Sequence, residues 1–263
     1  MPQVHLDTIP IWDAYKLNTE CPICALEEAC EKQFIDVALG GAMMEPDTRI
    51  ATNEKGFCAT HFKQMYDMNN KLSLALMTHT HLKDVMASTD KQAEALLKAL
   101  NAEKKKNPVA RTANGVTKAS PFHKQLAAMA DHVQARTDSC YICDRIKNSM
   151  DRYIETICYL YRKDESFREA FKNSKGVCVH HYPLLLRGAL DHMAGSPMQL
   201  PFVEDLLALQ KRNMERMEHD LEWFTLKFDY RNQDKPWGDS KGSLERTVNK
   251  LRSWCLGDEP NPK

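Results

Sequence analysis

Cys21-Pro-Ile-Cys24 and Cys58-Ala-Thr-His61 are the two stretches that decide the fold, because both recur later in the chain. The first returns as Cys140-Tyr-Ile-Cys143, and the second returns at nearly the same offset as Cys178-Val-His-His181. Four residues of metal-ligand type are thus kept in register, with a slip of one position in the spacer. This regularity predicts an internally duplicated chain with one metal site in each half.

The two motifs have the spacing of zinc ligands. A CxxC turn brings two thiolates to one ion, a CxxH turn brings a thiolate and an imidazole, and zinc takes four such ligands in a tetrahedron. We expect each half to be a helical hairpin in which the CxxC opens the first helix and the chain returns to lay the CxxH beside it. The predicted ligand sets are Cys21, Cys24, Cys58 and His61 in the first half, and Cys140, Cys143, Cys178 and His181 in the second.

Some alternatives stay open at these motifs. The repeat register selects His181 as the ligand and leaves His180 as a neighbour or a substitute. Three cysteines and one histidine can also hold a [4Fe–4S] cluster, and a CxxC can act as a redox dithiol. Covalent haem attachment is excluded, because neither CxxC is followed directly by histidine.

The composition predicts a soluble globular protein. The chain has 263 residues, of which 43% are hydrophobic and 27% charged, and its formal net charge is +0. We therefore expect no nucleic-acid partner and no membrane association. The N-terminus shows no export signal, so we expect a cytoplasmic protein in which nine cysteines are ligands or buried thiols rather than disulfides. Cys30, Cys158 and Cys255 lie outside the motifs.

Helical periodicity dominates the chain, and we find no convincing strand pattern. The longest apolar stripe runs from Val203 through Leu207, Gln210 and Met214 to Phe228, which predicts a long amphipathic helix and leaves a homodimer through 203–228 as an alternative. We predict an all-α fold with a first metal-binding half at 1–102, a linker at 103–120, a second half at 121–228, and a loop with a last helix at 229–263.

A pocket at His79 and His81 is the place where a reaction centre would be sought. These histidines interrupt an apolar helical run, but residues two apart on a helix point in different directions, so one buried and one exposed histidine is the simpler expectation. The chain has no Walker loop, GxGxxG, GxSxG or HExxH motif. Whether the protein is an enzyme is left open by its sequence.

Several stretches together resemble an uncharacterised bacterial family, found mainly in anaerobic Firmicutes, with tandem CxxC and CxxH motifs. They are Asp7-Thr-Ile-Pro-Ile-Trp-Asp13, Asn53-Glu-Lys-Gly-Phe-Cys58, Leu74-Ala-Leu-Met-Thr-His-Thr-His81 and Phe228-Asp-Tyr-Arg-Asn232, together with the four motifs. The resemblance implies the metal-site pattern and no assigned activity.

These observations favour a binding or regulatory module with two structural Zn²⁺ sites and an unidentified protein or small-molecule partner. The first alternative is an iron–sulfur protein in redox chemistry or in sulfur or metal handling. The second is an enzyme with its pocket at His79 and His81.

Overall fold

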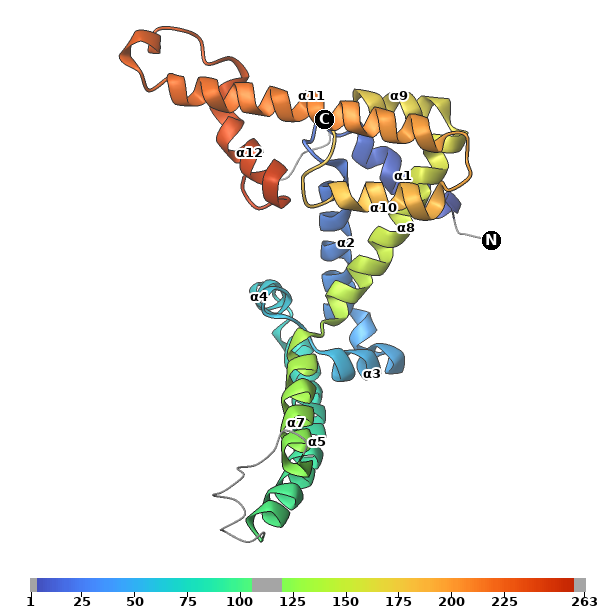
Figure 1. Ribbon diagram of the computed structural model, residues 1–263, viewed down its shortest axis with the longest axis vertical. Helices are drawn as coiled ribbons and strands as arrows, with labels where there is room; N and C mark the ends of the chain where they lie inside the picture. The colour runs from blue at the N-terminus through green and yellow to red at the C-terminus, as the bar shows by residue number, and fades with distance from the viewer. Residues whose placement is uncertain (1–3, 106–119, 258–263) are drawn as a thin grey trace. The chain divides into compact units, whose positions relative to one another are not determined.

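The computed structural model describes residues 4–105 and 120–257, and within those residues the chain is helical without any strand (Figure 1). The expected all-α class is therefore confirmed, while most of the predicted linker, residues 106–119, lies outside the described part. The helices are α1 (Val4–Lys16), α2 (Pro22–Leu39), η1 (Gly41–Met44), α3 (Pro46–Lys55), α4 (Ala59–Asp67), α5 (Lys71–Lys104), α7 (Pro121–Asp138), α8 (Tyr141–Lys163), α9 (Glu165–Asn173), α10 (Tyr182–His192), α11 (Gln199–Leu226), η2 (Tyr230–Asn232), η3 (Gly238–Gly242) and α12 (Ser243–Arg252).

The chain divides into two compact units that do not follow the predicted halves. Unit 1 combines residues 1–30 with 147–263, and unit 2 is the continuous stretch 31–146. The boundaries therefore fall inside α2 and α8 rather than in a linker near residue 110. Long helices explain this outcome, because the 18 residues of α2 span about 27 Å and carry the chain away from Cys24 instead of returning it there.

Unit 1 has an aromatic core. Tyr161 of α8 packs edge-on against Phe202 of α11 with ring centres 4.9 Å apart, and Phe171 of α9 lies 5.4 Å from the same ring. Tyr15 of α1 packs edge-on against Phe167 at 5.0 Å. Because aromatic side chains bury large areas, these contacts pack α1, α8, α9 and α11 around one core.

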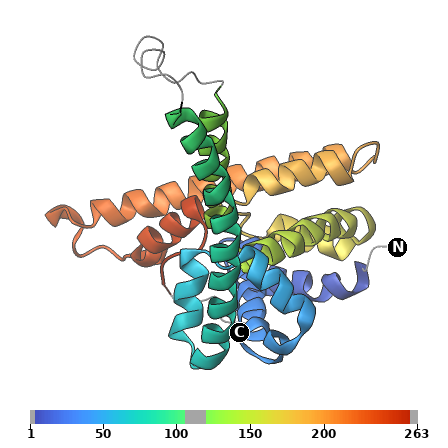
Figure 2. The ribbon, with the colours of Figure 1, turned by 90° about the horizontal axis from the view of Figure 1, so that it is seen from below.

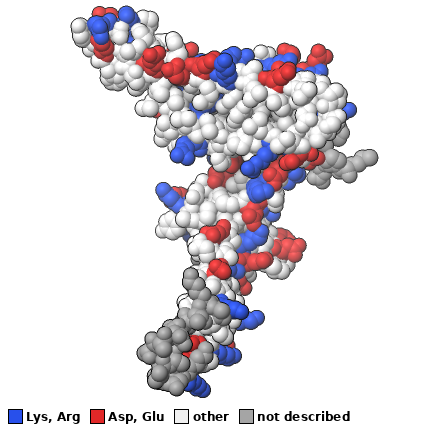
Figure 3. Space-filling model, viewed as in Figure 1, with Lys and Arg blue, Asp and Glu red and all other residues white. Residues whose placement is uncertain are grey.

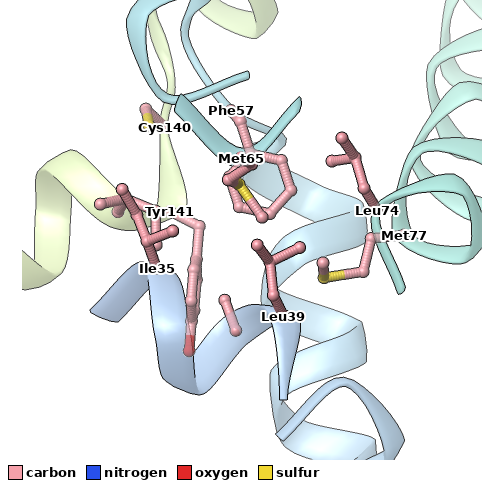
Figure 4. Packing of buried hydrophobic residues seen from close by; sticks show 10 residues of the cluster. Ile35, Leu39, Phe57, Met65, Leu74, Met77, Cys140 and Tyr141 are labelled. Atoms are coloured by element: carbon pink, nitrogen blue, oxygen red, sulfur yellow. The ribbon is translucent and has the colours of Figure 1, made fainter. Parts of the chain in front are cut away.

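Unit 2 has a separate core formed by the end of α2 and the helices that follow it. Figure 4 shows Ile35 and Leu39 of α2 with Phe57, Met65 of α4 and Tyr141 at the start of α8. Figures 1 and 2 both show α5 and α7 side by side as a long helical pair, in agreement with their contacts. This core places the starts of α4 and α8 close together.

The long helix α11 is present as predicted, but the predicted stripe is buried only in part, at Gln210 and Met217. The fully buried side chains include Phe202, Leu206 and Leu209, whereas Leu207 is 51% exposed. Phe228, which ended the predicted stripe, lies beyond the helix and is 74% exposed. In the first turns of the helix the apolar row one position earlier packs into the core, and farther along Gln210 and Met217 of the predicted stripe are buried.

The charge of the surface and the apolarity of the helices can be described from the structure. Figure 3 shows Lys and Arg mixed with Asp and Glu over the face that it presents, so no field of one sign covers that face. None of the described helices is long and apolar enough to cross a membrane.

Candidate metal centres

The eight predicted ligands form two Cys3His groups, but the motifs are exchanged between the halves. Site 1 contains Cys21, Cys24, Cys178 and His181, and site 2 contains Cys58, His61, Cys140 and Cys143. The predicted pairing of each CxxC with the CxxH of its own half is therefore wrong. Each site lies wholly within one unit, site 1 in unit 1 and site 2 in unit 2.

The exchange follows from where the helices end. Cys24 lies in the first turn of α2, while Cys58 follows α3 and precedes α4, whose Met65 packs with Leu39 at the far end of α2. The CxxH of the first half therefore meets the start of α8, which carries Cys140 and Cys143. Local spacing does not distinguish these pairings, because both offer the same four ligand types.

In site 1, three cysteine sulfur atoms surround Nδ1 of His181. The sulfur atoms of Cys21, Cys24 and Cys178 lie 3.6, 3.4 and 3.2 Å from that nitrogen. The Sγ atoms of Cys24 and Cys178 are 3.6 Å apart, and no residue of the group is more than 4% exposed. Site 1 is thus a closed, fully buried group that could hold a metal ion.

Site 2 repeats this geometry around Nδ1 of His61. The sulfur atoms of Cys58, Cys140 and Cys143 lie 3.2, 3.2 and 3.4 Å from it, and the Sγ atoms of Cys58 and Cys143 are 3.8 Å apart. His61 and Cys140 are buried, Cys58 is half-buried and Cys143 is exposed. Site 2 could hold a metal ion as well, but two of its thiols reach the surface.

Tight backbone turns before each CxxH set its position. Gly56 has φ +61° and Gly176 has φ +72°, a region that favours glycine over other residues. In site 2, the carbonyl of Gly56 accepts a hydrogen bond from Tyr141 N at 2.9 Å, and Ser139 Oγ donates to the Lys55 carbonyl at 2.7 Å. These bonds tie the turn before Cys58 directly to the start of the other motif.

In site 1, the last helix, α12, holds the two motifs together. Lys250 of α12 is 1% exposed, and its Nζ donates to the backbone carbonyls of Glu20 and Lys175, just before the two ligand turns. The Lys250 carbonyl accepts from Val179 N at 2.8 Å. Ser253 Oγ lies 3.2 Å from the sulfur of Cys24. This role has no signal in the sequence, because lysine is usually exposed.

Each candidate histidine ligand also has a carboxylate beside its second nitrogen. His61 Nε2 lies 3.0 Å from Glu31 Oε1, and His181 Nε2 lies 3.1 Å from Glu27 Oε2. The second contact is close but is not aligned as a hydrogen bond, since His181 Nε2 has no hydrogen-bond partner among the described residues. Carboxylates in this position orient a metal-binding imidazole and fix which nitrogen carries the proton. Both glutamates belong to α2, and neither has a carboxylate at the corresponding position of the second half.

The thiols of each group cannot all ionise easily without a cation. Burial and the neighbouring thiols raise the pKa of Cys21, whereas hydrogen bonds from Cys21 and Cys24 hold the pKa of Cys178 far below its usual range. Burial opposes ionisation of Cys140, but hydrogen bonds, first from His61, lower its pKa to about 6, while burial and Cys140 raise the pKa of Cys143. A divalent ion at the centre would offset this mutual repulsion of thiolates.

A cavity of about 610 Å³ borders site 1. Its wall includes Cys21 and Cys24 together with Arg216, Arg246 and Trp254. The side chain of Arg216 forms a short ion pair with Glu20, which also lines the cavity. No sequence pattern indicates this cavity, because its wall draws on residues far apart in the chain.

The predicted pocket at His79 and His81 does not form a shared site. His79 is exposed, whereas His81 Nδ1 lies 2.8 Å from the Asn53 carbonyl and its ring packs under Gly56. His81 therefore supports the turn that precedes Cys58. His180 is exposed, with its ring centre 5.0 Å from that of His181, so the structure places His181 rather than His180 among the thiols.

Known proteins give this chain a family but no activity. No curated protein and no solved structure matches the chain. A family match covers residues 3–258, which include both candidate metal centres and nearly the whole chain. The predicted membership in an uncharacterised family is confirmed, and the chain belongs to the Family of unknown function DUF6062.

Proposed function

We propose that the protein binds two zinc ions, one in each Cys3His group, and that the ions stabilise a binding or regulatory module. The observation that carries the proposal is the convergence of three thiols and one imidazole nitrogen at two separate places. Four ligands of this kind close the coordination of zinc and leave no open position for a substrate, as is typical of structural sites.

The distances support a single ion in each group. Zinc bonds of about 2.3 Å to sulfur and about 2.0 Å to nitrogen place tetrahedral ligand atoms about 3.5–3.8 Å apart. One sulfur–sulfur pair in each group is 3.6 or 3.8 Å apart, the sulfur–nitrogen distances run from 3.2 to 3.6 Å, and all ligand atoms of a group lie within 4.8 Å of one another. A [4Fe–4S] cluster binds each ligand through a different iron and needs a wider spread of ligand atoms.

The partner is proposed from the cavity beside site 1. Its wall offers the cations Arg216 and Arg246, the carboxylate of Glu20 and the indole of Trp254, which suits a small polar molecule with an aromatic or apolar face. A homodimer through residues 203–228 stays a prediction, to which the exposed Leu207 and Phe228 could contribute. A location in the cytoplasm likewise stays a prediction.

Elemental analysis of protein purified without oxygen tests the metal. Two zinc ions per chain and no visible absorption are expected. Iron with acid-labile sulfide and a broad visible band would replace zinc by a cluster and turn the proposed function toward redox chemistry.

A pair of double variants tests how the ligands are paired. Cys24→Ala with Cys178→Ala removes two ligands of site 1 and should leave one zinc per chain. Cys24→Ala with Cys58→Ala removes one ligand from each site and should lower the zinc content at both. If instead Cys24→Ala with Cys58→Ala leaves one zinc per chain and Cys24→Ala with Cys178→Ala lowers the zinc content at both sites, each CxxC pairs with the CxxH of its own half.

A further inference from the structure

The two candidate metal centres differ in their access to solvent. In site 1 the three thiols are buried, with at most 4% of any residue exposed, and two of them, Cys21 and Cys24, border the cavity described above. In site 2, Cys143 is exposed and Cys58 is half-buried. Thiolates react with oxidants and other electrophiles according to how exposed the thiolates are. The two sites should therefore not respond alike.

The two accessible thiols of site 2 are also close neighbours. Cys58 and Cys143 have their sulfur atoms 3.8 Å apart, and a disulfide bond is about 2.05 Å long. Cys58 precedes the first residue of α4, and Cys143 lies in the first turn of α8. A shift of about 1.8 Å between these helix starts would therefore join the sulfurs.

We propose that Cys58 and Cys143 form an oxidation site whose disulfide releases the metal of site 2 while site 1 keeps its own. This inference rests on the proposed metal-binding function. The oxidant is a peroxide. One thiolate attacks a peroxide oxygen and becomes a sulfenic acid as the O–O bond breaks and hydroxide leaves.

The second thiolate then attacks the sulfenic sulfur, so that the S–S bond forms and a second hydroxide leaves. Two protons convert both hydroxides to water, and two electrons pass from the thiolates to the peroxide. The metal retains only Cys140 and His61 of its four ligands and dissociates, because affinity depends on the complete thiolate set.

Release of this metal should loosen the start of α4. That helix has nine residues, too few to be stable alone in water, and His61 lies in its first turn. Its Met65 is fully buried in the same cluster as Cys140, so part of the helix stays anchored. The expected change is therefore local to the region around residues 56–62.

The experiment uses full-length protein carrying Cys255→Ser. Cys255 is the exposed thiol outside both groups, whereas Cys30 and Cys158 are buried, so this change removes the background reaction. The metal-loaded variant is treated with hydrogen peroxide, and released zinc is followed with a chromogenic chelator. One zinc per chain should appear in a fast phase, and mass spectrometry should map a single Cys58–Cys143 disulfide.

A second variant provides the matched control. Cys143→His, in the same background, keeps a zinc ligand at this position but cannot form the disulfide. It should bind two zinc ions and release neither in the fast phase. If it cannot load site 2, disulfide mapping in the parent variant decides the question.

Simultaneous loss of both zinc ions, a Cys24–Cys178 disulfide, or equally fast release from Cys143→His would overturn the inference. The metal content before oxidation tests the proposed function separately. Mapping of the disulfide tests this inference whichever metal the protein contains.

Discussion

Substitution of Gly56 by alanine should disrupt site 2 and leave site 1 intact. Gly56 has φ +61° and ψ −153°, a conformation essentially restricted to glycine, which costs another residue about 1–3 kcal/mol. A Cβ atom would also lie 2.3 Å from Nε2 of His81. The ring must then move away from the Asn53 carbonyl, which it approaches to 2.8 Å, at a further cost of about 1 kcal/mol.

The total of roughly 2–4 kcal/mol should weaken metal binding at site 2 by about 30- to 1,000-fold, because the turn leads directly to Cys58. Competition with a chelator of known affinity measures this change. Gly176 occupies the equivalent turn of site 1, but its Cβ would first meet the flexible Gln210 side chain at 3.1 Å. Gly176→Ala should therefore weaken metal binding at site 1 by the cost of the backbone conformation alone, which is smaller than the total for Gly56→Ala.

Two controls make the result decisive. A Cβ atom added at Gly41 would meet no other atom within 4 Å, so Gly41→Ala should leave both sites unchanged. All four tryptophans lie in unit 1, so their fluorescence should report normal folding in Gly56→Ala while zinc is lost from unit 2. Equal metal affinity in Gly56→Ala and Gly41→Ala would refute the reasoning, as would a larger effect of Gly176→Ala.

Four further substitutions separate the remaining interactions. Glu31→Ala should lower metal affinity at site 2 alone by about 10- to 100-fold, and Glu27→Ala should do the same at site 1, as measured by chelator competition. Lys250→Met leaves two buried carbonyls without their donor and should cost roughly 2–4 kcal/mol in urea unfolding, whereas the exposed Lys241→Met should cost almost nothing. Burial raises the pKa of Tyr161, so its stabilising contribution is complete below pH 10, the usual tyrosine value, and is lost as the pH rises further; Tyr161→Phe should flatten that alkaline loss in unfolding titrations.

The candidate ligand residues and the helices around them were predictable because both depend on local sequence. Cys21 and Cys140 immediately precede helices, as expected of a CxxC that opens a helix. The pairing was not predictable, since two chemically equal CxxC motifs face two equal CxxH motifs. The length of α2 and the burial of its far end favour the observed arrangement.

Other parts of the candidate sites were hidden for different physical reasons. Lys250 is a buried cation whose partners are backbone carbonyls, and a sequence does not display carbonyl positions. Glu27 and Glu31 lie among several charged residues of α2, so nothing singled them out before their distances to the histidines were known. In the first turns of α11, two neighbouring apolar rows are available, and the one that contains Phe202 and Leu206 is buried.

The insertion of unit 2 within unit 1 has a consequence during synthesis on the ribosome. The nascent chain first exposes Cys21, Cys24, Cys58 and His61, a complete but non-native ligand set. Cys140 and Cys143 must emerge before His61 can reach its native partners, and His181 follows several seconds later at about 5–20 residues per second. On the proposed function, early metal capture would favour the wrong quartet, and correct assembly would require that the first ion arrive late or exchange readily between thiolates.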